Sequence, residues 1–429
     1  MKAFILAGGK GTRLSSITKG EIPKPMAVIC GKPIIEWVIL NLKKNGITDI
    51  IISVSHLKEV IFDFVKDGSP FGVNVSYVVE DEPLGSGGSL FLLKDKVDGD
   101  FIVCPGDAVF DINVEKMATF HRQKGALITL FAHPNLHPYD SDLIIANSDG
   151  LVTDFSFKNA TRDFYYKNCV NAGIMIINSK ALEGLTQLRK MNIEHDFVFP
   201  LITSKKVYAY LSTEYVKDVG TSERFEKTTR DILAGIPQKK NLNNKQKAIF
   251  LDRDGTINTF EGFVKKAEDI RLLQDVERAI GLINQSEYLT IIVSNQPVIA
   301  RGESTFDEVE KMFNKIETLL GKEGVYVDGR YYCPHHPHSG FEGEIKELKF
   351  DCDCRKPKIG MLEKASVDFN LDLSQCIMVG DSERDVLTGK NAGIKTVRVT
   401  TGEQFKEGDN KPDYTATSLL DAVQWILGK

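Results

Sequence analysis

Two aspartates that follow an apolar segment carry the clearest chemical signal in the sequence. Residues 248–251 read Ala-Ile-Phe-Leu, which predicts a buried strand, and Asp252 and Asp254 come directly after it. Residues two apart in an extended chain point to the same side. One carboxylate can then act as a nucleophile while the other transfers protons, with Mg²⁺ neutralising the paired charges.

Two other interpretations of this pair are possible. Aspartates that cap a helix in a strand-to-helix turn have the same spacing, and Asp-x-Asp-Gly also begins calcium-binding loops. A calcium loop needs Glu at its twelfth position, where this chain has Phe263, and here the pair follows an apolar strand. These features disfavour calcium.

Two more predicted strands of the C-terminal half lead into polar side chains. Thr290–Ser294 ends in a hydroxyl that can donate to a phosphoryl oxygen, and Ile377–Val379 leads to Asp381. Lys356, between them in the sequence, offers a cation for the same group. The carboxyl ends of parallel strands meet at one edge of a sheet, so we expect these side chains to form one site.

The order of these motifs resembles the haloacid-dehalogenase-like phosphotransferase superfamily, over about residues 247–429. The resemblance implies that Asp252 is a nucleophile that forms an aspartyl-phosphate, and that Asp254 is the general acid and base. It implies that Ser294 and Lys356 bind the phosphoryl group. The implied Mg²⁺ ligands are Asp252, Asp254 and Asp381.

Cysteine and histidine side chains predict a second metal. Cys333 and His335 form a Cys-x-His pair, and Cys352 and Cys354 form a Cys-x-Cys pair a short loop away. Three thiolates and an imidazole suit a closed tetrahedral Zn²⁺ site, which leaves no open position for catalysis. The alternative is a set of reduced cysteines without metal. We expect a structural zinc that holds a loop beside Lys356.

Within the superfamily, the second half resembles the group of heptose 1,7-bisphosphate phosphatases and histidinol-phosphatases. The segments that carry the resemblance are 252–258, 294–296, 300–302, 333–337 and 352–358. It implies substrate-binding roles for Asn295, Arg301 and Arg355. The chain departs from the group at Pro297-Val298, where a small residue and Gly are usual, and in the extended acidic segment 339–351.

At the N-terminus, a predicted strand at Ala3–Ala7 runs directly into a glycine-rich loop. Glycine lets backbone N–H groups approach a phosphate closely, and an arginine can add a bidentate contact. The residues of this loop are Gly8, Gly9, Gly11, Thr12 and Arg13. Their spacing matches neither the dinucleotide fingerprint nor the P-loop.

Later motifs fit the same nucleotide site. Lys24 lies in a stiff Pro-Lys-Pro segment that can hold its ammonium group over the phosphates. A second glycine-rich turn suits a flat base lying against backbone, and its glycines are Gly85, Gly87 and Gly88. Asp107 and Asp218 can share a Mg²⁺ bound to a triphosphate.

Together these motifs resemble the sugar-1-phosphate nucleotidyltransferase family, over about residues 1–232. The resemblance implies that the glycine loop and Arg13 bind the triphosphate. It implies that Lys24 stabilises charge on the attacked α-phosphate and that Asp107 and Asp218 hold Mg²⁺.

The expected sugar site matches the family only in part. Asn171 and Gly173 match the segment that contacts the sugar. The family commonly has a Glu-Lys pair at the sugar and its phosphate, whereas Phe157 precedes Lys158 here. Lys158 therefore matches and the glutamate is missing.

The length of 429 residues and the alternation of strand-like and helical segments predict two α/β domains. Residues 235–246 are polar and amide-rich, which predicts a linker between domains at 1–234 and 247–429. We expect a Rossmann-like nucleotidyltransferase domain with a mixed, mostly parallel sheet. A doubly wound haloacid-dehalogenase-like domain with a zinc-binding loop would follow it.

Charge and hydropathy restrict the partners. The formal net charge of −5 argues against nucleic-acid binding. No apolar run reaches the ~20 residues that span a bilayer, and the N-terminal apolar stretch is too short for a signal peptide. These features predict a cytoplasmic location and no membrane partner. A homo-oligomer is compatible with the sequence, which does not decide it.

Joining the two resemblances predicts consecutive reactions. A D-glycero-D-manno-heptose 1,7-bisphosphate would lose its 7-phosphate, and the heptose 1-phosphate would receive GMP from GTP. The motifs at 23–26 and 82–88 resemble heptose 1-phosphate guanylyltransferases, which favours GTP. The alternatives are an ADP-, CDP- or UDP-linked product, another sugar phosphate, or a histidinol-phosphatase-like enzyme with a non-catalytic N-terminal module. The expected cofactors are Mg²⁺ in both domains and structural Zn²⁺.

Overall fold

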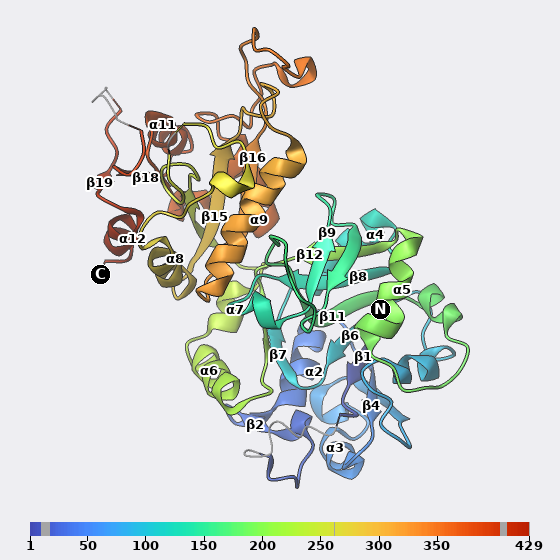
Figure 1. Ribbon diagram of the computed structural model, residues 1–429. Coiled ribbons are helices and arrows are strands. Elements are labelled where there is room, and N and C mark those ends of the chain that lie inside the picture. The colour runs from blue at the N-terminus through green and yellow to red at the C-terminus, as the bar shows by residue number, and fades with distance from the viewer. Residues whose placement is uncertain (10–17, 261, 404–409, 429) are drawn as a thin grey trace. The chain divides into compact units, whose positions relative to one another are not determined.

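The computed structural model describes residues 1–9, 18–260, 262–403 and 410–428 (Figure 1). Contacts divide the chain into two compact units. The first unit comprises Met1–His133, Asp142–Phe157 and Val170–Leu242, and the second comprises Pro134–Ser141, Lys158–Cys169 and Asn243–Lys429. Within the described residues, no helix is both long enough and apolar enough to cross a bilayer.

The first unit is built on a mixed sheet with the strand order β10-β9-β11-β6-β1-β4-β5, and β8 pairs with both β11 and β12. The pairing is parallel from β6 through β1 and β4 to β5, and antiparallel where β11 meets β6, β8 and β9. The strands are β1 (Lys2–Leu6), β4 (Asp49–Val54), β5 (Asn74–Val79), β6 (Asp100–Pro105), β8 (Ile128–His133), β9 (Leu143–Ala146), β10 (Val152–Ser156), β11 (Val170–Asn178) and β12 (Val207–Leu211).

Side-chain alternation along β1 explains its central place. Ala3 and Ile5 join one buried cluster with residues of α2, whereas Phe4, which is also fully buried, points to the opposite face. The helices of this unit are α2 (Ile34–Lys44), α3 (Lys58–Val65), α4 (Val114–Lys124), α5 (Phe199–Leu201), α6 (Ser222–Leu233) and α7 (Ile236–Lys240). A π-helical turn, Ile193–Val198, precedes α5.

Two short ladders lie outside this sheet. β2 (Val28–Ile29) pairs with β3 (Lys32–Pro33), and β7 (Ala108–Asp111) pairs with β13 (Tyr215–Asp218). The second ladder runs antiparallel and sets Asp218 opposite Ala108, the residue after Asp107. It therefore brings two aspartates together that are far apart in the sequence.

The second unit contains a six-stranded parallel sheet in the order β16-β15-β14-β17-β18-β19. The strands are β14 (Lys247–Leu251), β15 (Tyr288–Asn295), β16 (Gly329–Cys333), β17 (Ile377–Gly380), β18 (Lys395–Val399) and β19 (Tyr414–Ala416). The helices are α8 (Val276–Asn284), α9 (Phe306–Lys322), α10 (Gly360–Phe369), α11 (Glu383–Asn391) and α12 (Leu419–Leu427).

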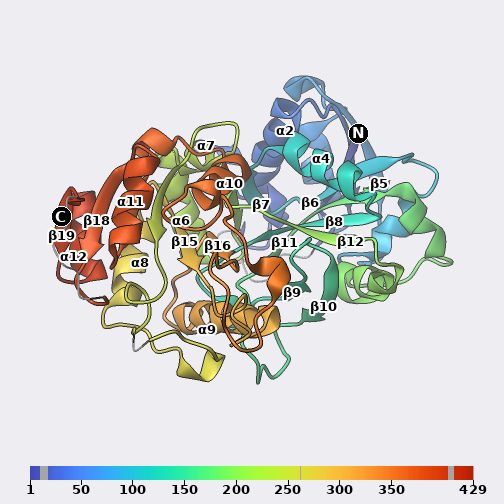
Figure 2. The ribbon, with the colours of Figure 1, turned by 90° about the horizontal axis from the view of Figure 1, so that it is seen from above.

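Both faces of this sheet are covered by helices. On β14, Ile249 and Leu251 pack in the cluster that includes α8, α9 and α12, and Ala248 and Phe250 pack in the cluster that includes α10. Figure 2 shows α9 and α10 on opposite sides of β16. This arrangement is doubly wound, as predicted. The predicted strands of both halves are confirmed, each to within two residues at either end.

The second unit includes two segments of the N-terminal half, Pro134–Ser141 and Lys158–Cys169. The backbone N–H of Tyr166 donates to Thr318 Oγ1 at 2.8 Å, and that of Asn168 donates to the Glu317 carboxylate at 2.7 Å. These acceptors lie on α9. No local pattern in residues 134–141 or 158–169 predicts this packing.

The stretch expected as a linker is partly ordered. It contains α7, and Pro237, Asn241 and Leu242 are buried. Asn241 Nδ2 donates to Asp111 Oδ1 at 2.6 Å, so this end of the first unit is fixed by a buried hydrogen bond.

Candidate active sites

Three carboxylates gather at the carboxyl ends of two neighbouring strands of the second unit. Asp252 follows β14 and Asp381 follows β17, and these strands pair in parallel with Leu251 beside Val379. Asp385 comes from the first turn of α11. Oxygen atoms of Asp252, Asp381 and Asp385 lie within 4.8 Å of one another, which defines the carboxylate cluster of this unit.

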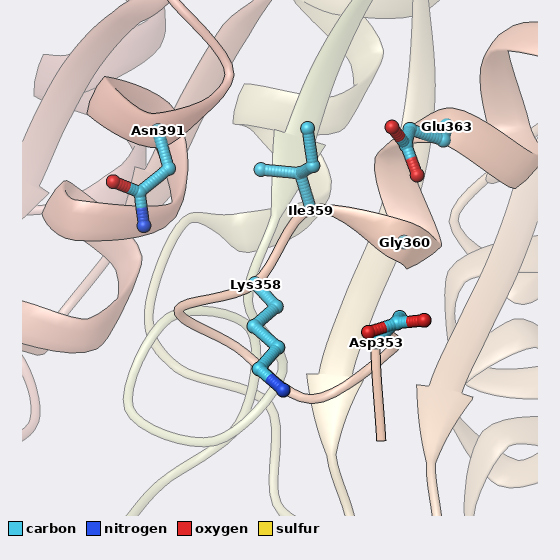
Figure 3. A pocket seen from close by; sticks show the side chains of 6 residues that line it. All are labelled: Asp353, Lys358, Ile359, Gly360, Glu363 and Asn391. Carbon is cyan, nitrogen blue, oxygen red and sulfur yellow. The ribbon is translucent and has the colours of Figure 1, made fainter. Parts of the chain in front are cut away.

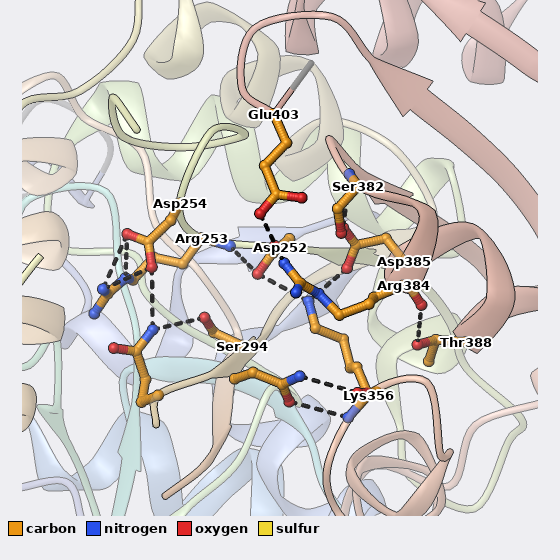
Figure 4. A network of polar contacts seen from close by, with 12 residues as sticks. Asp252, Arg253, Asp254, Ser294, Lys356, Ser382, Arg384, Asp385, Thr388 and Glu403 are labelled. Carbon is orange, nitrogen blue, oxygen red and sulfur yellow. Dashed lines mark hydrogen bonds and ion pairs between the residues drawn. The ribbon is translucent and has the colours of Figure 1, made fainter. Parts of the chain in front are cut away.

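Lys356 is the cation of this cluster (Figure 4). Its Nζ lies 2.9 Å from Asp252 Oδ1 and 2.5 Å from Asp385 Oδ1, and its side chain is 2% exposed. Burial, opposed by the lysine charge and reinforced by the neighbouring carboxylates, raises the pKa of Asp252 to about 6 and that of Asp381 to about 7. One lysine thus compensates three carboxylates only in part, and the oxygen donors suit a hard divalent cation such as Mg²⁺.

Glycines make room for the cluster. Gly255 has φ +78°, and a Cβ built on it would lie 2.3 Å from Asp381 Oδ2. A Cβ on Gly402 would lie 1.8 Å from the same atom. Larger residues at these two positions would displace the Asp381 carboxylate.

The Asp254 side chain lies outside the cluster. Its carboxylate accepts two hydrogen bonds from the Arg253 Nη2 group at 2.8 and 2.9 Å and one from Asn258 Nδ2 at 2.9 Å. Gln296 Nε2 donates a further bond at 3.2 Å. These bonds fix Asp254 in one orientation, which a group that exchanges protons requires. They do not bring its carboxylate to Asp252 and Asp381, the other two predicted metal ligands.

The end of β15 positions Lys356. The Asn295 side chain donates to the Lys356 carbonyl at 3.0 Å and accepts from the Lys356 N–H at 3.0 Å. Asn295, predicted to bind substrate, therefore also holds the lysine in place. Ser294 Oγ accepts from Gln296 Nε2 at 2.8 Å, which leaves the hydroxyl proton for another acceptor.

The predicted zinc ligands do form a group. Cys352 Sγ lies 3.4 Å from Cys333 Sγ and 3.3 Å from Cys354 Sγ, and His335 Nδ1 lies 3.3 Å from Cys354 Sγ. The edge of a zinc–thiolate tetrahedron is roughly 3.8 Å. Hydrogen bonding from Cys333 lowers the pKa of the Cys354 thiol to about 5. The donor set and its spacing fit a small tetrahedral metal.

This Cys/His group is connected to the substrate-binding residues expected beside it. Arg355 Nη1 donates to the His335 carbonyl at 3.0 Å. Arg301 is held differently, with its guanidinium 4.8 Å from the Phe263 ring and 4.4 Å from the Phe341 ring. Phe341 belongs to the acidic segment expected to alter the rim.

A hollow near this group contains none of the predicted residues. It measures about 300 Å³ and is lined by Asp353, Lys358, Ile359, Gly360, Glu363 and Asn391 (Figure 3). The Lys358 ammonium lies 2.7 Å from Asp351 Oδ2. No member of the carboxylate cluster lines the hollow.

In the first unit, Lys24 lies between the two predicted metal ligands. Its Nζ is bonded to Asp107 and lies 3.2 Å from Asp218 Oδ1, although Lys24 is only 6% exposed. Arg224 Nη1 contacts the other Asp218 oxygen at 2.9 Å. A Cβ on Gly220 would lie 3.3 Å from Lys24 Nζ, so that position needs a small residue.

Glu80, which the sequence analysis missed, lies under the start of the glycine loop. It follows β5, is 5% exposed, and its Oε2 accepts from the Leu84 N–H at 3.0 Å. A Cβ built on Gly8 would lie 2.8 Å from Glu80 Oε1. Burial raises the pKa of Glu80. In the sequence, Glu80 lies between the two glycine-rich turns. That position is the feature from which its role could have been predicted.

The predicted base loop packs tightly on another segment. A Cβ on Gly85, which has φ +75°, would lie 2.4 Å from the Met191 carbonyl oxygen, and one on Gly87 would lie 2.9 Å from Ile193 Cα. A Cβ on Gly88 would likewise lie 2.4 Å from the Arg189 carbonyl oxygen. These glycines therefore serve close backbone packing.

The remaining predicted residues are placed as follows. Asn171 and Gly173 lie in β11, where Asn171 Oδ1 accepts from the Gly173 N–H at 3.2 Å. Among the residues that the structure describes, no atom lies within 4 Å of a Cβ built on Gly9. Lys158 belongs to the second unit. Gly11, Thr12 and Arg13 lie outside the described residues.

Replacing Lys356 by Met should destabilise the second unit. Removing one partner of a buried ion pair leaves uncompensated charge and costs about 3–5 kcal/mol. We expect the free energy of unfolding, measured by urea denaturation in EDTA, to fall by about 3 kcal/mol. The double variant Lys356→Met/Asp385→Asn should recover part of the loss. An unchanged free energy for the single variant would contradict this placement of the lysine.

Comparisons with known proteins match two parts of the chain to two different families. A family model described as nucleotidyl transferase matches residues 2–235, and one described as HAD-hydrolase-like matches residues 353–422. The D-glycero-beta-D-manno-heptose-1,7-bisphosphate 7-phosphatase of Haemophilus ducreyi is 40% identical over 184 residues, which are 42% of this chain and 98% of that protein. The protein of that name from Escherichia coli K12 is 37% identical over 42% of this chain and 93% of its own length.

Among solved structures, HddC from Yersinia pseudotuberculosis in complex with GMP-PN is 26% identical and covers 54% of this chain and 99% of its own, with a TM-score of 0.46. The chain belongs to the nucleotidyl transferase family through residues 2–235 and to the haloacid-dehalogenase-like phosphatases through its C-terminal part, and it is an enzyme with both activities.

Proposed function

We propose that the chain carries out two consecutive steps in the synthesis of a nucleotide-activated heptose. The second unit removes the 7-phosphate of D-glycero-D-manno-heptose 1,7-bisphosphate, and the first unit transfers GMP from GTP to the heptose 1-phosphate. The observation that carries the proposal is the fusion of a nucleotidyltransferase with a close homologue of phosphatases for that bisphosphate. The product of one step is then the substrate of the other.

In the phosphatase step, an Asp252 oxygen attacks the phosphorus and the sugar alkoxide leaves. Lys356 and the Ser294 hydroxyl hold the phosphoryl oxygens, and Asp254 donates a proton to the alkoxide. Asp254 then accepts a proton from the water that hydrolyses the aspartyl-phosphate. A Mg²⁺ held by Asp252 and Asp381 would neutralise charge on the transferring group. The bonds to Asp254 keep it oriented through both proton transfers.

In the nucleotidyl step, a phosphate oxygen of heptose 1-phosphate attacks the α-phosphorus of the nucleotide and pyrophosphate leaves. Lys24 lies where an ammonium group can stabilise charge on that phosphorus centre. Asp107 and Asp218, which flank it, have the oxygen donors for Mg²⁺. The chain needs only to position the reactants and compensate charge.

Glu80 supports guanine as the base. A carboxylate has two acceptor oxygens and no donor. Guanine presents two adjacent donors on one edge, N1–H and the 2-amino group, whereas the other three bases mix donors and acceptors there. The carboxylate lies against Gly8 and beside the base loop through Leu84. This position supports the proposal that the base is guanine.

The Cys/His group supports a structural zinc. Its four donors leave no position for a substrate, and it fixes Arg355 through the His335 carbonyl. Metal binding there would stabilise the loop that carries Arg355 and Lys356.

The two active sites should be separable by mutation. Asp252→Asn should abolish phosphate release from heptose 1,7-bisphosphate and leave pyrophosphate release from GTP and heptose 1-phosphate intact. Lys24→Ala should do the reverse. The assay supplies each substrate with Mg²⁺ and identifies the nucleotide sugar by mass spectrometry. Loss of both activities in either single variant, with the fold retained, would contradict independent sites.

Glu80→Gln should weaken the preference for GTP. The amide keeps an acceptor for Leu84 but replaces one acceptor by a donor, which opposes a guanine donor. We expect kcat/KM for GTP to fall roughly 10- to 100-fold relative to that for UTP. Pyrophosphate release with each of four nucleoside triphosphates measures this ratio. Asp81→Asn, at the exposed next position, is the matched control, and an unchanged preference in Glu80→Gln would exclude Glu80 from base selection.

Cys354→Ser should remove the zinc. We expect about one zinc per wild-type chain by inductively coupled plasma mass spectrometry. The variant should lose it together with most phosphatase activity, because Arg355 and Lys356 are then less well held. Nucleotidyl transfer should persist, and Cys30→Ser, outside the Cys/His group, should retain the metal. Metal-free wild-type protein with full phosphatase activity would rule the site out.

A further inference from the structure

We propose that Glu194 binds the hydroxyl groups of the sugar phosphate in the nucleotidyltransferase unit. The inference rests on the proposed function only in taking a sugar 1-phosphate as the acceptor. Glu194 lies in the π-helical turn Ile193–Val198, and such turns occur often at functional sites. The case rests on what its carboxylate contacts.

The Glu194 carboxylate is joined to the segment expected to contact the sugar. Asn171 Nδ2 donates to Glu194 Oε1 at 3.2 Å, and the same asparagine accepts from the Gly173 N–H at 3.2 Å. Gly173 has φ +73°, and a Cβ built on it would lie 3.9 Å from Pro105. Pro105 ends β6, two residues before Asp107. Glu194 is thus connected to the strand that leads to the predicted metal ligand.

On its other side, the turn holds the base loop. The Ile193 N–H donates to Ser86 Oγ at 2.9 Å, and the Gly87 N–H donates to the Met191 carbonyl at 3.0 Å. The residues just before Glu194 therefore fix the loop expected at the nucleotide base. The turn that carries Glu194 thus contacts that loop, and through Asn171 it contacts β11, which pairs with β6, the strand before Asp107.

The chemistry of the group fits a polyol. A carboxylate can accept about four hydrogen bonds, and Asn171 and the backbone N–H of Glu194 itself supply two. Adjacent sugar hydroxyls are donors spaced to meet both oxygens. Burial, with a contribution from Asp142, raises the pKa of Glu194, so the charged form lacks compensation. Sugar hydroxyls would supply donors that the partly buried carboxylate lacks.

Phe157 occupies the position at which the family commonly has a glutamate, so no carboxylate is present there. Its ring stacks on Phe155 at 5.6 Å and lies 5.2 Å from the His195 ring. The aromatic cluster therefore fills the position before Lys158 and packs on the residue next to Glu194. Glu194 supplies, from another element, an acidic group that position 157 does not.

Glu194→Gln tests the proposal. The amide oxygen still accepts from Asn171, so the local structure is kept, while one acceptor for the sugar becomes a donor. We expect the KM for the sugar 1-phosphate to rise roughly 10- to 100-fold with the KM for the nucleoside triphosphate unchanged. Phosphatase activity should also be unchanged. Glu183→Gln, an exposed carboxylate in the same unit, is the control.

Each result of this test either supports or contradicts the role proposed for Glu194. An unchanged sugar KM in Glu194→Gln would show that Glu194 only holds Asn171. If that variant does not fold, Glu194→Asp, which keeps the charge but withdraws it, should still raise the sugar KM, and a wild-type value would overturn the proposal. The wild-type enzyme is first assayed with several sugar 1-phosphates. If the enzyme accepts a different sugar 1-phosphate but not the heptose, the proposed function is refuted. The proposal for Glu194 is then tested with the sugar that the enzyme accepts. Acceptance of none would refute both.

Discussion

A buried ammonium group between two carboxylates is the interaction on which both sites depend. Lys356 lies between Asp252 and Asp385, and Lys24 lies between Asp107 and Asp218. An isolated buried charge is costly, so each lysine requires its carboxylates and they require it. The lysine is also the group that a phosphoryl oxygen would meet. The same arrangement thus stabilises the folded chain and, in the proposed function, offers a cation to a charged substrate.

The surrounding strands and glycines hold these charged groups in position and leave room for them. In the second unit, parallel pairing of β14 with β17 places Asp252 beside Asp381, and Gly255 and Gly402 leave room for the second carboxylate. The Asn295 side chain fixes the backbone of Lys356 from a third strand. In the first unit, the pairing of β7 with β13 brings Asp107 and Asp218 together. In both units, strand ends and small residues therefore bring carboxylates around a buried lysine.

The polar groups proposed to select the substrate come from different parts of the chain than those that compensate charge. Glu80 is buried and Glu194 is partly buried, burial raises the pKa of both, and both adjoin the predicted base loop or the segment that packs on it. Acceptors of this kind favour donor-rich ligands, which a guanine edge and a polyol both are. In the second unit, Arg355 is positioned through the Cys/His group instead. Selection thus depends on tertiary contacts more than on strand ends.

The fold class, the strands and the residue types at each strand end could be predicted from the amino-acid sequence. Apolar alternation and glycine-rich turns are local signals, and Asp252, Asp381, Lys24 and the four Cys/His residues each lie within a recognisable short motif. Which of these residues meet depends on the folded chain. The Asp254 carboxylate is turned toward Arg253 and away from the cluster, Asn295 holds Lys356, and Glu194 reaches Asn171 across two elements. The contacts of Asn295 and Glu194 join residues that are distant in sequence, and the orientation of Asp254 depends on partners from other elements such as Gln296. The free energy that selects these contacts comes from packing and charge compensation in the folded chain, which no local pattern records.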